Sequence, residues 1–114
     1  MKINSWNDQL ILFSDGSTIT YDYEQECCEV NYADFSVLEM FYNDEEFIDF
    51  TIEYAEDGFL LILLGVGLVP HAKKIFIPCY SEQNGYYSNN ITVYAEHSDG
   101  SVDIMGVICE VVLV

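Results

Sequence analysis

Three segments of the chain alternate hydrophobic and polar residues with a period of two. In residues 18–24 the hydrophobic positions are Ile19, Tyr21 and Tyr23, and the residues between them are threonine or acidic. Residues 48–54 and 91–97 repeat this pattern. Because successive side chains of a β-strand point to opposite faces, the alternation predicts three strands, each with one buried face and one wet face.

Two other hydrophobic runs do not alternate. The run FLLILL at 59–64 predicts a strand that is covered on both faces, and GVG at 65–67 predicts a tight turn or bulge after it. The final run VICEVVLV at 107–114 predicts a last strand in the centre of a sheet, preceded by a bulge at Gly106.

Turn signals separate these runs. Asp-Gly pairs at 15–16, 57–58 and 99–100 lie between hydrophobic runs and predict hairpins. The tetrapeptide SDGS occurs at both 14–17 and 98–101, but the flanking residues differ, which argues against an internal repeat. Residues 83–90 contain Asn84-Gly85 and predict a loop, which we expect to join strands 74–80 and 90–97 as neighbours.

One short helix is predicted near residues 36–43. Ser36 can cap it, and Glu39 lies three residues later, which is the spacing of a capping box. A second short turn is expected at 71–74, after Pro70. The whole pattern predicts a mainly β protein: an antiparallel sandwich or half-open barrel of about seven or eight strands, in a single compact domain of residues 1–114.

The charge of the chain is strongly unbalanced. It has 20 acidic residues against 3 lysines and no arginine, a formal net charge of −17, and residues 3–72 contain no lysine or arginine. Hydrophobic residues make up 51% of the chain, so it is rich enough to build a core and does not resemble a disordered acidic tail. Direct binding to nucleic acid or to an anionic membrane is excluded because both require clustered cations. A basic protein surface is the partner that such a charge favours.

The sequence also indicates the cellular location of the protein and the redox state of its cysteines. The N-terminal segment lacks the pattern of a signal peptide, and the hydrophobic run at 58–69 is too short to span a bilayer. We therefore expect a cytoplasmic protein with its four cysteines as free thiols. If the cysteine pair is part of a strand, Cys28 shares a face with Val30 and Tyr32 and is expected in the core. Cys27 would then lie on the opposite face and be exposed.

The residues that could carry chemistry form no known motif. Cys27, His71 and His97 do not have the spacing of a metal site, and we expect no metal and no cofactor. A cysteine–histidine pair brought together by folding remains an alternative. The acidic neighbours of Cys27 would raise its pKa and make it a poor nucleophile, so no catalytic residue is assigned.

The acidic run and the two loop tyrosines are the strongest binding candidates. Thirteen of the 20 acidic residues fall within residues 22–57, where strands would set them in rows at spacings close to the ~7 Å between phosphates of one DNA strand. A solvated surface is the plain interpretation of the same residues. In the loop we expect the ring of Tyr87 to be buried and that of Tyr86 to be available. The candidate partner-binding residues are Asp44, Glu45, Glu46, Asp49, Glu53, Tyr86 and Tyr87.

The Cys-Cys-Glu stretch at 27–29 and the Asn-Gly-Tyr-Tyr-Ser loop at 84–88 resemble those of an uncharacterised family of small bacterial and phage-borne domains. The resemblance implies a prokaryotic or phage origin and no activity. It also implies that the two motifs form one feature. If they are neighbours in space, the loop is expected to pack on the face of Cys28.

These observations predict a non-catalytic acidic binding protein that docks on a basic surface of a partner, as an inhibitor, an immunity protein or a nucleic-acid mimic. One alternative is a small-ligand binder or enzyme that uses Cys27 or His97 near the Tyr86–Tyr87 loop. Another is a structural domain whose acidity serves solubility. An exposed edge strand would also allow a homodimer. The sequence does not identify the partner or the host.

Overall fold

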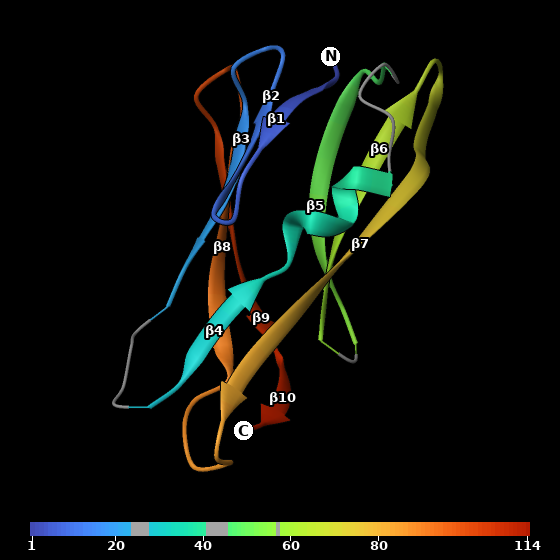
Figure 1. The fold of residues 1–114 in the computed structure, drawn as a ribbon. Helices are drawn as coiled ribbons and strands as arrows, with labels where there is room; N and C mark the ends of the chain where they lie inside the picture. Colours follow the sequence, from blue (N-terminus) through green and yellow to red (C-terminus); the bar gives the residue numbers. More distant parts are fainter. Residues whose placement is uncertain (24–27, 41–45, 57) are drawn as a thin grey trace.

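The computed structural model describes residues 1–23, 28–40, 46–56 and 58–114, which form ten strands and one short 3-10 helix (Figure 1). The molecule is elongated, with extents of 45 × 27 × 22 Å. In chain order the elements are β1 (Ile3–Trp6), β2 (Leu10–Phe13), β3 (Thr18–Asp22), β4 (Val30–Ala33), η1 (Phe35–Met40), β5 (Asp49–Ala55), β6 (Phe59–Val66), β7 (Val69–Gln83), β8 (Asn90–Glu96), β9 (Val102–Ile108) and β10 (Glu110–Leu113).

The strands form two sheets that face each other. The first sheet has the order β1-β2-β3-β8-β9, and the second has the order β10-β7-β6-β5, with β4 also paired to β7. The described pairs are antiparallel except for β10 with β7, which is parallel. The prediction of a mainly β sandwich or half-open barrel is confirmed, although the described residues form more strands than expected. No helix in the described part of the chain is long and apolar enough to cross a membrane.

The core lies between the two sheets. The rings of Phe13 on β2 and Phe50 on β5 stack with centroids 4.3 Å apart, and so join one sheet to the other. The alternation at 91–97 is confirmed, because Ile91, Val93 and Ala95 are all buried. Each such side chain contributes roughly 1.5–3 kcal/mol through removal of apolar surface from water, alanine less.

The predictions for residues 59–74 are partly right. Strand β6 is covered on both faces over most of its length, with a bulge near Gly65 toward its end and a turn after it at Gly67, which has φ 60°. The turn expected at 71–74 is wrong, because these residues belong to the long strand β7. His71 has φ 53° within that strand, so the backbone irregularity after Pro70 is a local kink and does not end the strand.

Two of the Asp-Gly pairs form the predicted hairpin turns, between β2 and β3 and between β8 and β9. Gly16 and Gly100 have φ of 90° and 89°, which glycine adopts without a side-chain clash. The third pair also lies in a hairpin, since β5 pairs with β6 and Gly58 has φ 84°; Asp57 lies outside the described residues.

The helix prediction at 36–43 is corrected in type and start. The described helix is the 3-10 helix η1, which ends at Met40, and residues 41–43 lie outside the described part. Asp34 occupies the cap instead of Ser36: its Oδ1 accepts hydrogen bonds from the amide and the hydroxyl of Ser36 at 3.0 and 2.5 Å. The hydroxyl of Ser36 is therefore engaged with the residue before the helix and does not cap the next turn.

Two long-range expectations are wrong. The loop after β7 does not join hydrogen-bonded neighbours, because β7 and β8 belong to different sheets and the loop crosses between them. The final run does not form a central strand: it is divided between β9, which pairs without interruption at Gly106, and β10, which lies at an edge. The division places Val107 and Cys109 inside and leaves the rest of the run largely exposed.

Candidate functional site

The predicted partner-binding residues fall into two separate regions. Glu46, Asp49 and Glu53 are exposed on and just before β5, whose start lies near the N-terminus, because the terminal amine of Met1 donates to the carbonyl of Phe47 at 2.6 Å; Glu53 lies further along the strand, toward the turn at Gly58. Asp44 and Glu45 lie outside the described residues.

The tyrosine loop lies beside the C-terminal strand, at the end labelled C in Figure 1. Tyr86 is 87% exposed, as expected, whereas Tyr87, which was expected to be buried, is only half-buried. A Cβ on Gly85 would lie 3.5 Å from Leu113, so the loop packs against β10. The acidic residues of β5 and the tyrosines therefore do not form one site.

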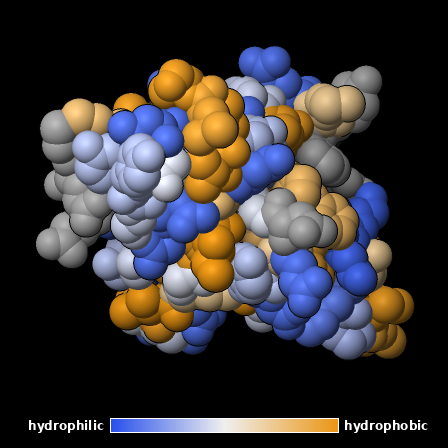
Figure 2. Space-filling view, turned by 90° about the horizontal axis from the view of Figure 1, so that it is seen from below, coloured by the Kyte–Doolittle hydropathy of each residue, from blue (hydrophilic) through white to orange (hydrophobic). Residues whose placement is uncertain are grey.

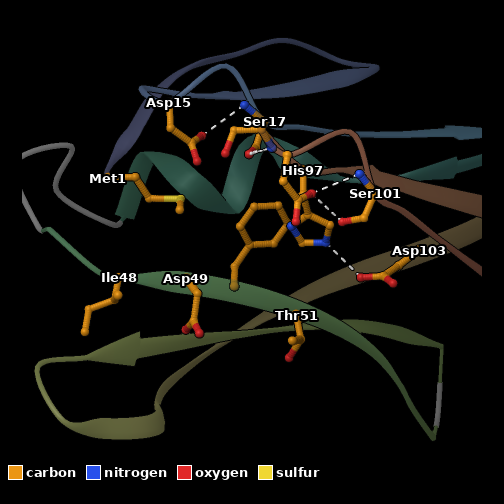
Figure 3. Close-up of a pocket in the computed structure, with 12 residues that line it drawn as sticks. Met1, Asp15, Ser17, Ile48, Asp49, Thr51, His97, Ser101 and Asp103 are labelled. Atoms are coloured by element: carbon orange, nitrogen blue, oxygen red, sulfur yellow. Dashed lines mark hydrogen bonds and ion pairs between the residues drawn. The ribbon is translucent and has the colours of Figure 1, made fainter.

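At the N-terminal end, the two Asp-Gly turns meet above β5 and enclose an acidic hollow of about 300 Å³ (Figure 3). The turn at 14–17 contributes Asp15 and Ser17, the turn at 98–101 contributes Asp99, and β5 and β9 contribute Asp49 and Asp103. Sequence analysis did not predict this hollow. The signal that pointed to it is the repeated SDGS, whose copies come together here although they lie far apart in the chain.

The carboxylates of the two turns are held in the charged state. Ser17 donates its amide to Asp15 at 2.9 Å, and Ser101 donates its hydroxyl and amide to Asp99 at 2.6 and 2.9 Å. Slight burial opposes ionisation of Asp15, but the hydrogen bonds from Ser17 and Ser98 outweigh it and lower its pKa. Hydrogen bonds from Ser101 lower the pKa of Asp99. Both groups therefore stay ionised in mild acid.

His97 lies at the floor of the hollow. Its ring stacks on Phe50 with centroids 4.6 Å apart, and its Nε2 lies 2.8 Å from Oδ2 of Asp103. Among the described residues, no three His, Cys, Asp or Glu side chains are grouped so that they could hold a metal ion.

Beneath the tyrosine loop lies a buried polar network. Ser81 donates to the side-chain oxygen of Asn31, whose amide donates to the carbonyl of Ser88 at 3.0 Å. Gln83 donates to Ser81 at 2.7 Å and accepts the amide of Tyr87 at 2.8 Å. The network ties β4, β7 and the loop together, so the shape of the loop is set from the protein interior.

The expectations for the cysteine segment are partly wrong. The loop does lie beside β4, but it packs on the face of Asn31, whereas Cys28 and Val30 point outward. Cys28 is exposed and disulfide-bonded, so it is neither a core residue nor a free thiol. Cys27 lies outside the described part. Cys28 and Val30 point outward because Asn31 finds hydrogen-bond partners in the interior, so β4 turns its polar side inward.

Cys79 and Cys109 are buried free thiols, in agreement with the expectation for these two. The hydrogen bond with Cys109 and burial raise the pKa of Cys79, which keeps this thiol protonated. Both lie in the core and neither has the exposure that a nucleophile requires.

No family model matches the chain, and comparison with curated proteins and with solved structures finds no match.

Proposed function

We propose that this chain is a non-catalytic acidic binding protein that docks on a basic surface of a partner protein. The observation that carries the proposal is the exposure of its carboxylates. Of the acidic residues in the described part of the chain, only Glu29 is buried. With 20 acidic residues and 3 lysines, most of these carboxylates have no cation to pair with inside the molecule, and a partner can supply one.

The acidic hollow suggests how a partner would be held. A lysine or arginine side chain that enters it would meet carboxylates from both Asp-Gly turns and from β5. Asp15 and Asp99 would meet it in the ionised form, because their pKa values are lowered. Glu53 shares a face of β5 with Asp49 and Thr51, which line the hollow, and Glu46 precedes this strand; both are exposed and would extend the contact.

An inhibitor, an immunity protein and a nucleic-acid mimic all fit this description. For each of them, long-range attraction would accelerate association and salt would weaken it. The alternative that relies on His97 near the tyrosine loop has less support, because His97 follows the end of β8 and the loop precedes its start. Seven residues of extended strand separate them by roughly 23 Å.

The test is capture of a partner on the immobilised chain from a lysate of the source organism. We expect a basic protein to be retained at low salt and released at moderate salt. The variant Glu46→Lys/Glu53→Lys should lose the partner. The matched reversal Asp8→Lys/Glu96→Lys, at exposed positions of the first sheet, should retain most of the captured partner. Circular dichroism confirms that both variants are folded.

Equal loss of capture in both variants would show that only total charge matters and would contradict a defined docking surface. Absence of any salt-sensitive basic partner would overturn the proposed function itself. It would favour the solubility interpretation of the acidic surface.

A further inference from the structure

Strand β10 is an edge strand with unusually apolar side chains. Its residues Val111, Val112 and Leu113 are 39%, 38% and 71% exposed, and Val114 after it is 83% exposed. Figure 2 looks onto this end of the molecule and shows hydrophobic side chains in a band across it, between hydrophilic areas. Natural edge strands are usually protected by shortness, charge, proline or a bulge; β10 is four residues long and begins with Glu110, but its remaining residues are apolar, with no lysine or proline among them.

The outer edge of β10 is open for hydrogen bonding. Strands β4 and β10 both pair with Glu82, through Val30 and Val112, so they occupy the two edges of β7. The amide of Val114 donates to the carbonyl of Gln83 at 3.2 Å. Because alternate residues direct their backbone groups to the same side, Val112 also faces β7, and Val111 and Leu113 face away from it. In the described chain no strand pairs with that side.

We infer that β10 pairs antiparallel with β10 of a second copy of this chain, about a two-fold axis that passes beside Val112. In this register Val111 of each copy faces Leu113 of the other, and these residues exchange the backbone hydrogen bonds that are open in the single chain. Val112 of one chain faces Val112 of the other chain across the axis. The second sheet of one copy and the second sheet of the other join through β10 into one continuous sheet. The contact uses the same surface on both copies and therefore closes as an isologous dimer.

The distribution of charge allows a second copy to pair with the open edge of β10 despite the net charge of −17. Glu110 would face Val114, so no carboxylate on β10 opposes another directly. The acidic hollow lies at the opposite end of a molecule 45 Å long, far beyond the Debye length of ~8 Å at physiological salt. A Cβ on Gly85 would lie 3.5 Å from Leu113, so the tyrosine loop borders the proposed interface.

Sedimentation equilibrium tests the inference on the intact chain. The wild type should have twice the mass of the chain and dissociate on dilution. Val112→Glu places two carboxylates directly opposite each other and should weaken the dimer by ~100-fold or more. Leu68→Glu is the matched control, since Leu68 is 101% exposed at the other end of the molecule and should leave the dimer intact.

A mixture of Val112→Glu and Val112→Lys chains provides a test of the register. Each variant alone should be monomeric, and the mixture should form a heterodimer, because opposite charges then face each other at the axis. A monomeric wild type at all concentrations, a dimeric Val112→Glu chain, or a mixture that stays monomeric would each overturn the inference.

Cross-linking keeps the inference testable if the charged variants fail to fold. Val112→Cys should give a covalent dimer on oxidation, because facing residues of a pair without mutual hydrogen bonds lie close together. Leu68→Cys and the wild type should remain uncross-linked. A folded Val112→Cys chain that forms no covalent dimer would contradict the pairing.

Discussion

The backbone amide of Ser98 donates a hydrogen bond of 3.0 Å to the hydroxyl of Ser17, 81 positions earlier in the chain. This bond joins the two SDGS turns and fixes the rim of the acidic hollow. Ser17 is 1% exposed, so loss of its hydroxyl would leave the amide of Ser98 without that acceptor in a partly buried place.

Ser17→Ala should therefore lower the free energy of unfolding by about 1–2 kcal/mol. The control is Ser5→Ala, at an exposed position on β1, which should change it by less than about 0.5 kcal/mol. Urea unfolding monitored by the fluorescence of Trp6 measures both. Equal stability of the two variants would contradict a structural role for the bond between the turns.

Asn31→Ala should destabilise the fold by about 1–3 kcal/mol, because it leaves the hydroxyl of Ser81 without its acceptor and removes the shorter of two hydrogen bonds to the carbonyl of Ser88, the other being from Gln83 at 3.4 Å. The exposed Asn4→Ala is the matched control and should have little effect. Chemical denaturation measures stability, and faster hydrogen exchange in residues 84–89 would show that the loop has lost its support. An unchanged loop would count against the network as its anchor.

Gly58→Ala should destabilise more than Gly100→Ala. Both glycines have positive φ, 84° and 89°, so each substitution carries a backbone cost of about 1–2 kcal/mol. A Cβ on Gly58 would also lie 2.8 Å from the amide nitrogen of Glu110, whereas a Cβ on Gly100 meets open space. The difference in thermal midpoint between the variants measures the contact of the β5–β6 turn with β10. Equal midpoints would show that the backbone at Glu110 shifts to accept the added Cβ without loss of stability.

The lowered pKa of Asp99 predicts a pH-dependent contribution to stability. A carboxyl whose folded pKa is below its unfolded value stabilises the fold above the unfolded pKa, and this contribution is lost as pH falls through the folded pKa. The wild type should thus be more stable than Asp99→Ala at pH 7, and the difference should disappear as pH falls below the ordinary value of 3.8. Urea unfolding between pH 7 and strong acid is the measurement. A difference that persists in strong acid would refute the role of the ionised group.

Added salt should stabilise the protein. Twenty acidic residues with few cations repel one another, and ions screen this repulsion. Relief of ~1 kcal/mol would raise the melting temperature of a domain of 114 residues by about 4 °C. Calorimetry at low and moderate sodium chloride tests this, with sucrose as the uncharged control. A melting temperature that falls with moderate salt would mean that attractive pairs outweigh the repulsion.

Local features of the fold follow from the sequence because their causes are local. Alternation identified the buried face of β8 through Ile91, Val93 and Ala95, and the conformational freedom of glycine located the turns at Gly16 and Gly100. The expectation that the chain binds neither nucleic acid nor an anionic membrane rests on charge, which depends only on composition. These properties need no knowledge of which strands are neighbours.

Tertiary structure decided everything that depends on remote partners. Asn31 is polar yet buried, because Ser81 and Ser88 satisfy its hydrogen bonds from other parts of the chain, and so the outward position of Cys28 could not be inferred. The division of the last hydrophobic run between two sheets was equally hidden. Hydrophobicity requires that apolar side chains be buried, but only the pairing of distant strands determines that Val107 is covered while Leu113 remains exposed at an edge.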